Sequence, residues 1–151
     1  MPDATLPDTT LEITRVFSAS RARVFAAWMD PDALRAWYRH SPDWSVPVAE
    51  VDLRVGGRYR IGLQMPGRDP FYEQGEFREV VAEERLVYTN SLQGSAEADH
   101  EGTLVTVTFR DAPGGGCEVT VREEGFPSSR VRDLHASGWP GFLDQLAALV
   151  C

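Results

Sequence analysis

Apolar and polar residues alternate along several short stretches of the chain. In Arg58–Gln64, for example, Tyr59, Ile61 and Leu63 share one face, and charged or polar residues occupy the other. A period of two residues predicts a β-strand with one buried and one solvated face. Turn-forming residues separate most of these stretches, which is typical of an antiparallel sheet covered on one side. The predicted strands are Leu11–Phe17, Val46–Val55, Arg58–Gln64, Tyr72–Val81, Arg85–Ser91, Thr103–Asp111 and Cys117–Glu124.

Three other stretches have helical spacing. Arg21–Met29 follows a serine that can cap it, and a second short helix begins at Pro31, since proline is favoured at the first helical position. In Ser128–Val150 apolar residues recur every three or four positions, which predicts a long amphipathic helix. Pro140 lies inside this helix between two glycines, so we expect a kink or a break over Ser137–Gly141.

Two adjacent glycines, Gly56 and Gly57, lie between two of the predicted strands. A phosphate-binding glycine loop needs a helix directly after the glycines, because the amide groups at a helix start bind the anion. A strand follows here instead. The pattern therefore favours a two-residue hairpin turn in which both glycines adopt positive φ.

The bulk composition indicates one globular domain. The chain has 151 residues, of which 42% are hydrophobic and 25% charged. Its formal net charge of -8 argues against nucleic acid or an anionic membrane as the main partner, because both attract basic surfaces. The first residues, MPDATLPDTT, lack the basic and apolar regions of a signal peptide. We predict a flexible N-terminus over residues 1–10 and a single domain over residues 11–151.

The two cysteines indicate the cellular compartment of the protein. Cys117 lies in a predicted strand, Cys151 is the last residue, and no metal-ligand spacing joins them. Two unpaired cysteines fit a reducing environment. The sequence therefore predicts a cytoplasmic protein.

Five local motifs are spread along nearly the whole chain: RVFSASRARVFAAW (Arg15–Trp28), DPDALRAWY (Asp30–Tyr38), VPVAEVDLRVGGRYRI (Val46–Ile61), GEFREVVAEERLVYT (Gly75–Thr89) and GWPGFLDQLAALV (Gly138–Val150). Their order and spacing resemble the bacterial branch of the family named after the activator of the heat-shock chaperone ATPase, in the START/polyketide-cyclase superfamily. This resemblance implies an α+β helix-grip fold, in which a curved antiparallel sheet of about seven strands wraps around a long C-terminal helix and two short helices follow the first strand. It also implies a cavity between the sheet and that helix.

Aromatic residues and a few polar residues on inward phases are candidates for the wall of such a cavity, since ligand sites are mostly apolar with few polar groups. Strand alternation puts Glu123 in phase with Val121, and His135 precedes Trp139 by four positions on one helical face. Two alternatives stay open: the aromatic residues only fill the core, and Glu123 lies at the solvated end of its strand. The candidate cavity residues are Trp37, Trp44, Tyr59, Tyr88, Asn90, Phe109, Glu123, His135, Trp139 and Phe142, with His40 at the cavity mouth.

The sequence shows no catalytic or metal-binding motif. Ala96–Gly102 (AEADHEG) contains acidic residues and a histidine, but they are adjacent in a predicted turn rather than spread at ligand spacing, which favours a solvated loop. A nucleophile elbow, a His-Glu-x-x-His motif and a Cys-x-x-Cys pair are all missing from the sequence. We therefore expect no metal, no cofactor and no catalytic residue.

Three hypotheses for the function follow. The first is binding of a small hydrophobic or aromatic metabolite, lipid or toxic compound in the cavity, in a role such as stress response. The second is a cyclase- or dehydratase-type enzyme that uses Glu123 and His135 for acid–base chemistry. The third, suggested by the family name, is interaction with a chaperone. We expect a small hydrophobic molecule as the partner, neither nucleic acid nor membrane, and a monomer or a homodimer.

Overall fold

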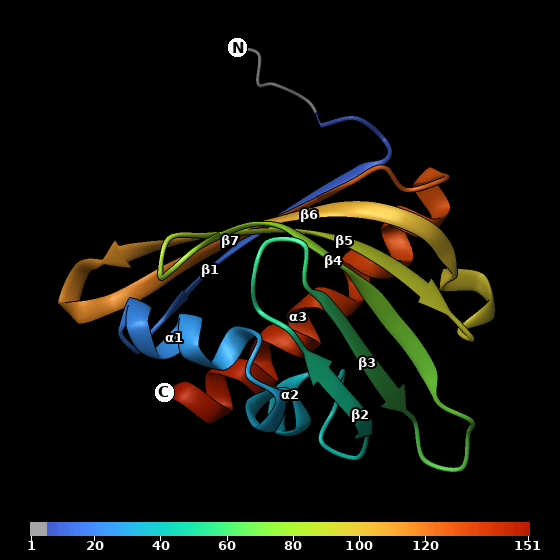
Figure 1. The fold of residues 1–151 in the computed structure, drawn as a ribbon, viewed down its shortest axis with the longest axis horizontal. Coiled ribbons are helices and arrows are strands. Elements are labelled where there is room, and N and C mark those ends of the chain that lie inside the picture. Colours follow the sequence, from blue (N-terminus) through green and yellow to red (C-terminus); the bar gives the residue numbers. More distant parts are fainter. Residues whose placement is uncertain (1–5) are drawn as a thin grey trace.

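Seven antiparallel strands form one sheet in the computed structural model, which describes residues 6–151. Their spatial order is β1-β7-β6-β5-β4-β3-β2, so β2 to β7 form a meander and β1 pairs with β7. The predicted helix-grip architecture is confirmed: the sheet curves over the C-terminal helix (Figure 1). The strands are β1 (Thr10–Phe17), β2 (Ser45–Val51), β3 (Arg58–Gln64), β4 (Phe71–Val81), β5 (Arg85–Gln93), β6 (His100–Ala112) and β7 (Gly116–Glu124).

Three α-helices lie on the same side of the sheet (Figure 1). Each begins after a capping residue whose side-chain oxygen accepts a backbone N–H, and these residues are Ser20, Asp30 and Ser128. Neither short helix is long enough to be stable in isolation, so packing against the sheet and the long helix holds them. The helices are α1 (Arg21–Trp28), α2 (Pro31–Trp37) and α3 (Ser129–Val150), and two single 3₁₀ turns, η1 (Ala96–Ala98) and η2 (Pro113–Gly115), precede β6 and β7.

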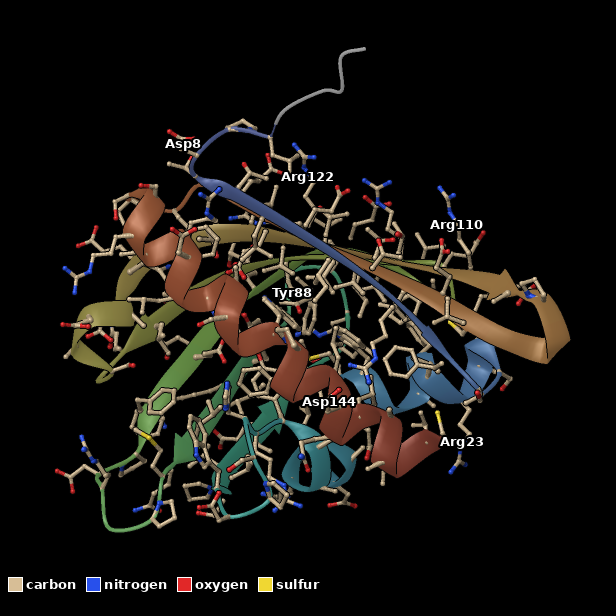
Figure 2. All side chains as sticks on the ribbon, turned by 180° about the vertical axis from the view of Figure 1, so that it is seen from behind. Asp8, Arg23, Tyr88, Arg110, Arg122 and Asp144 are labelled. Carbon is tan, nitrogen blue, oxygen red and sulfur yellow. The ribbon has the colours of Figure 1, made fainter. Side chains whose placement is uncertain are left out.

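The core lies between the sheet and the helices. Tyr88 points from the sheet toward α3, whereas Arg110 and Arg122 lie on the opposite, solvated side (Figure 2). This separation follows from strand alternation, since successive side chains point to opposite faces. Trp28 and Trp37, from α1 and α2, are both buried and pack against each other with their ring centroids 5.3 Å apart. Among the described residues, no helix has the length and apolar character required to span a bilayer.

The glycine pair is not a two-residue hairpin turn. Strand β2 ends at Val51, earlier than predicted, and a loop of six residues, from Asp52 to Gly57, leads to β3. Only Gly56 has positive φ, at 82°. The Gly56 N–H donates to the Phe77 carbonyl and the Phe77 N–H donates to the Gly57 carbonyl, so the loop pairs with β4. A strand follows the glycines, as predicted, and this excludes a phosphate loop of the helix-start type.

Of the predicted kink or break over Ser137–Gly141, the break is wrong, because α3 continues from Ser129 to Val150. Proline removes one backbone hydrogen bond, but buried side chains on both sides of it hold the two halves of α3 against the sheet, among them Trp139 and Leu143. The glycine at position 141 has a different role. A Cβ atom on Gly141 would lie 2.6 Å from the His40 carbonyl oxygen, so the glycine lets the loop after α2 approach the helix closely.

The N-terminal boundary also differs from the prediction. Residues 1–5 of the predicted flexible N-terminus lie outside the described residues. Thr10, the last residue of that predicted segment, already belongs to β1, where it is buried and pairs with Glu124. The ordered strand therefore begins one residue earlier than the sequence pattern indicates.

Candidate functional site

A cavity of about 240 Å³ lies between the sheet and α3. Its walls come from the loop after α2, the ends of β4, β5 and β7, and one side of α3. It therefore lies where the helix-grip resemblance implies a cavity. The lining residues are Tyr38, His40, Trp44, Phe71, Glu73, Leu92, Ser95, Ala98, Glu123, Leu134, His135, Ser137, Gly138, Trp139 and Phe142.

Stacked aromatic rings form one wall of this cavity. The rings of Tyr38 and Phe142 are stacked with their centroids 4.8 Å apart. The rings of His40 and Trp44 are tilted against each other with their centroids 5.6 Å apart. The loop that carries His40 and Trp44 is held by Arg39, which donates to the carbonyl oxygens of Pro42 and Trp44. His40 is exposed, so it lies on the solvent side of this wall.

Glu123 lies on β7 and faces inward, where it is 1% exposed. The alternative that Glu123 lies at the solvated end of its strand is therefore wrong. Thr103 Oγ1 donates to Glu123 Oε2 at 2.7 Å, and Trp139 Nε1 donates to Glu123 Oε1 at 3.2 Å. These contacts satisfy both carboxylate oxygens, as a buried carboxyl group requires.

Glu73 on β4 is a second buried carboxyl group in the same cavity, and the sequence interpretation missed it. Burial raises the pKa of Glu73 to about 7, and the Glu123 carboxylate adds to the rise. His135 opposes the rise, as do the polar side chains of Tyr38 and Asn90. A carboxyl group of this kind exchanges a proton near neutral pH. Strand alternation was the available signal, because Glu73 is in phase with Phe71.

Two histidines lie beside Glu123. The rings of His100 and His135 meet edge to face with centroids 4.9 Å apart, and Phe126 packs against both. His135 Nε2 lies 3.0 Å from the Ala98 carbonyl oxygen. The sequence interpretation paired Glu123 with His135 for acid–base chemistry, and the structure brings these two side chains together, but the interpretation overlooked His100.

His100 corrects the interpretation of Ala96–Gly102 as a solvated loop. It is the first residue of β6 and is only 6% exposed. Burial, together with the neighbouring His135, lowers the pKa of His100 to about 4, so His100 is neutral at pH 7. Within residues 6–151, neither ring nitrogen of His100 has a hydrogen-bond partner. An expectation of no metal that rested on a solvated loop thus loses its basis.

The structure separates the predicted cavity residues into two groups. Trp44, Glu123, His135, Trp139 and Phe142 line the cavity, together with His40. The others do not line it, and each has a structural partner instead. Trp37 Nε1 donates to the Ala27 carbonyl, Trp28 Nε1 lies 3.5 Å from the Tyr88 hydroxyl, Phe109 packs on Phe25 and Trp28, and Tyr59 contacts Asn90.

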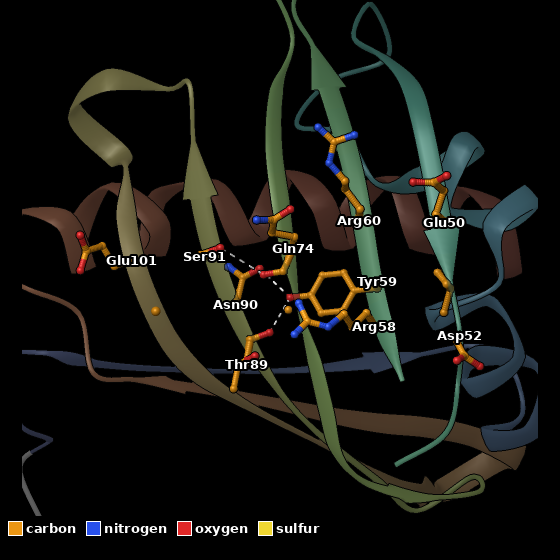
Figure 3. A pocket seen from close by; sticks show the side chains of 13 residues that line it. Glu50, Asp52, Arg58, Tyr59, Arg60, Gln74, Thr89, Asn90, Ser91 and Glu101 are labelled. Carbon is orange, nitrogen blue, oxygen red and sulfur yellow. Dashed lines mark hydrogen bonds between the residues drawn. The ribbon is translucent and has the colours of Figure 1, made fainter. Parts of the chain in front are cut away.

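Tyr59 and Asn90 border a different hollow of about 480 Å³, on the solvated face of β2 to β6 (Figure 3). The Tyr59 hydroxyl lies 2.7 Å from the Thr89 carbonyl oxygen and 2.7 Å from Asn90 Oδ1 (Figure 3). The rest of this hollow is lined by exposed side chains of both signs, such as Glu50 and Arg60. Mixed exposed charges of this kind are typical of a solvated surface, so we regard the inner cavity as the candidate site.

Comparison with known proteins agrees with this architecture. No curated protein matches the chain. Among solved structures, protein CV1439 from Chromobacterium violaceum is 31% identical, with 94% of this chain and 96% of that chain covered and a TM-score of 0.82. An AHSA1-like protein from Aeromonas hydrophila is 28% identical, with 91% and 90% covered and a TM-score of 0.71. Protein NE0264 from Nitrosomonas europaea, 23% identical over 97% of each chain, shares the fold with a TM-score of 0.78.

The family itself is identified by a match over most of the chain. The family described as "Activator of Hsp90 ATPase homolog 1-like protein" matches residues 18–151. This range includes every residue that lines the cavity. The resemblance inferred from the sequence motifs is confirmed, and the chain belongs to the family of activator of Hsp90 ATPase homolog 1-like proteins.

Proposed function

We propose that the chain binds a small, largely apolar molecule with one polar group in the cavity between the sheet and α3. The observation that carries this proposal is the contrast between two parts of the cavity. Aromatic rings such as Trp44 and Phe142 form one wall, and the buried carboxyl groups of Glu73 and Glu123 lie in another. Ligand sites commonly combine apolar walls with a few placed polar groups.

The volume of the cavity limits the ligand. Sites for drug-sized molecules have about 300–1,000 Å³, whereas a dry apolar cavity of about 150 Å³ is enough for benzene. The present cavity of about 240 Å³ lies between these values. A single substituted ring or a short acyl chain fits this volume. The carboxyl groups favour a ligand that donates a hydrogen bond, such as a phenol, an alcohol or an amine.

Binding can be tested by ligand-observed NMR with a panel of phenols, anilines and short-chain alcohols. The variant Leu92→Phe adds a ring to a buried residue that lines the cavity, and Val16→Phe adds the same ring at a position that is 60% exposed. We expect Leu92→Phe to abolish binding and Val16→Phe to retain it, with both variants folded. Equal binding by Leu92→Phe and wild type would contradict the proposal.

A cyclase- or dehydratase-type enzyme is the second candidate, and Glu73 is the observation that favours it. General acid–base catalysis is most effective when the pKa of the group lies near the working pH, and Glu73 has a pKa of about 7. Glu123 and His135 line the same cavity, so two carboxyl groups and one imidazole face one space. The test is product detection with polyketide-like substrates. A turnover lost in Glu73→Gln, while the substrate still binds, would favour the enzyme over a pure binder.

Other aspects of the function stay predictions. The chaperone interaction and the role in stress response rest on the family name alone. The cytoplasmic location, the lack of nucleic-acid and membrane partners, and the monomeric or homodimeric state rest on the sequence.

A further inference from the structure

Three potential metal ligands converge at one point of the fold. One ligand atom from each of His100, Glu123 and His135 lies within 4.8 Å of the other two. The three residues come from β6, β7 and α3, so the sheet and the helix both contribute. His100 and Glu123 are buried and His135 is partly buried. We call this group the histidine–glutamate cluster.

His100 has no protein partner that explains its burial. Both of its ring nitrogens are buried, and neither has a hydrogen-bond partner within the described residues. Burying an imidazole in this way is unfavourable, because the polar atoms lose water and gain nothing in return. The hydrophobic ring of phenylalanine would suit contacts with Phe126 equally well. A metal ion bound through one ring nitrogen would supply the missing interaction.

The contacts of the other two residues resemble those around metal ligands. A carbonyl oxygen only accepts hydrogen bonds, so His135 Nε2 carries the proton in its contact with Ala98 and the lone pair is on Nδ1. Metal-ligating histidines commonly donate their second ring N–H to a backbone carbonyl. The Glu123 carboxylate is held in turn by Thr103 and Trp139. Such outer contacts fix the orientation of a ligand before the ion arrives.

From these observations we infer that His100, Glu123 and His135 form a binding site for a divalent transition-metal ion of the Zn²⁺ type. Two imidazoles and one carboxylate suit Zn²⁺, Co²⁺ or Fe²⁺, whereas Mg²⁺ and Ca²⁺ prefer sites made only of oxygen. Ligand atoms at about 2.0–2.1 Å from a tetrahedral ion are roughly 3.4 Å apart, so the cluster contracts slightly on binding.

The position of the cluster adds a chemical consequence. Glu123 and His135 also line the cavity, so an ion bound there borders the cavity. Three protein ligands leave a coordination position for water or for a donor atom of a bound molecule. This inference goes beyond the proposed function and does not rest on it, because the metal can be tested without any organic ligand.

The test is titration of the chelator-treated protein with Co²⁺, followed by visible absorption, and with Zn²⁺, followed by calorimetry. The exposed thiol of Cys151 is removed by Cys151→Ser in every sample. We expect one ion per chain and an absorption band of tetrahedral or five-coordinate Co²⁺. His135→Ala and Glu123→Gln should each weaken binding by at least about 10-fold, since even contacts outside the first shell contribute 10- to 100-fold.

Two further variants keep the test decisive. His100→Phe retains the packing against Phe126 and removes both nitrogens, so it should fold and lose the ion. His40→Ala is the matched control, because the chain has three histidines and His40 is the one that lies outside the cluster. Three results would overturn the inference: no saturable binding by the folded wild type, full binding by His100→Phe, or equal losses in His40→Ala and His135→Ala.

Discussion

The indole N–H of Trp139 donates a hydrogen bond to Glu123 Oε1 and thereby ties the middle of α3 to β7. Both residues line the cavity, so this bond also fixes the distance between α3 and β7 at the cavity. Hydrogen bonds to buried carboxylates contribute more than neutral ones, because the acceptor is costly to leave unsatisfied.

Trp139→Phe should therefore destabilise the protein beyond the effect of lost volume. Trp28→Phe is the matched control, since Trp28 is also buried but its Nε1 lies 3.5 Å from its partner, the Tyr88 hydroxyl. We expect the loss in unfolding free energy to be larger for Trp139→Phe by about 1–3 kcal/mol. Urea denaturation measures both. Equal losses in the two variants would show that the hydrogen bond contributes little.

Glu73 should make the stability of the metal-free protein depend on pH. Its pKa is raised by burial to about 7, so between its ordinary value of 4.5 and about 7 the folded state holds a proton that the unfolded state has released. Stability is then highest below pH 4.5 as far as this group is concerned, falls as the pH rises toward 7, and levels off above it. The full effect is up to about 3 kcal/mol.

Glu73→Gln removes this titration. We expect the variant to gain stability relative to wild type as the pH is raised from 5 to 8, measured by urea denaturation at each pH. Glu84→Gln, at an exposed glutamate, is the control and should follow the wild-type profile. Parallel profiles for wild type and Glu73→Gln would mean that Glu73 is ionised at pH 5 in the folded protein.

The loop before β3 should respond differently to alanine at its two glycines. Gly56 has φ of 82° with open space around it, so Gly56→Ala should cost roughly 1 kcal/mol from backbone strain alone. A Cβ atom on Gly57 would lie 2.1 Å from the Asp52 carbonyl oxygen, so Gly57→Ala should cost distinctly more. Gly102→Ala, with neither positive φ nor a close atom, is the control. Thermal denaturation should show the largest loss of stability for Gly57→Ala, a smaller loss for Gly56→Ala and the smallest for Gly102→Ala. A milder effect at Gly57 than at Gly56 would contradict this expectation.

Tyr59→Phe should lower stability without altering the cavity. The variant removes the hydroxyl that contacts Thr89 and Asn90 and leaves their oxygens without that partner, which costs about 1–3 kcal/mol for buried groups. Tyr59 does not line the inner cavity, so affinity for any ligand found by NMR should stay within error of wild type. A large change in affinity at unchanged stability would indicate that Tyr59 does contribute to ligand binding.

The order of the strands and helices was predictable because local periodicity determines which face of each element is buried. Glu123 and His135 illustrate this, since strand phase and helix phase alone pointed both inward. Glu73 follows the same rule with Phe71 and was open to prediction. That Trp37 and Phe109 lie in the packed core and not at the cavity could not be predicted. Periodicity distinguishes buried from exposed positions, but it does not show where a cavity lies among the buried ones.

His100 shows where periodicity fails. Counting back by twos from Thr103 would turn Glu101 inward. The pairing of β5 with β6 shifts by one residue between Asn90 and Leu92, so the phase changes and His100 is buried instead. A bulge of this kind depends on the neighbouring strand and leaves little trace in the sequence of its own strand. The uninterrupted helix at Pro140 likewise depends on packing from outside the segment.

The pairing of β1 with β7 has a consequence for how the chain acquires its structure. Thr14 and Thr120, which are 106 positions apart, face each other across these strands and share a hydrogen bond of 3.0 Å. The first strand to be synthesised therefore cannot pair until the last strand, β7, has been made, and α3 must follow before the apolar face is covered. Contacts this distant slow folding, because a long loop must close before they form. We expect the nascent chain to collapse late, with the local hairpins of β2 to β6 forming ahead of the closure by β1.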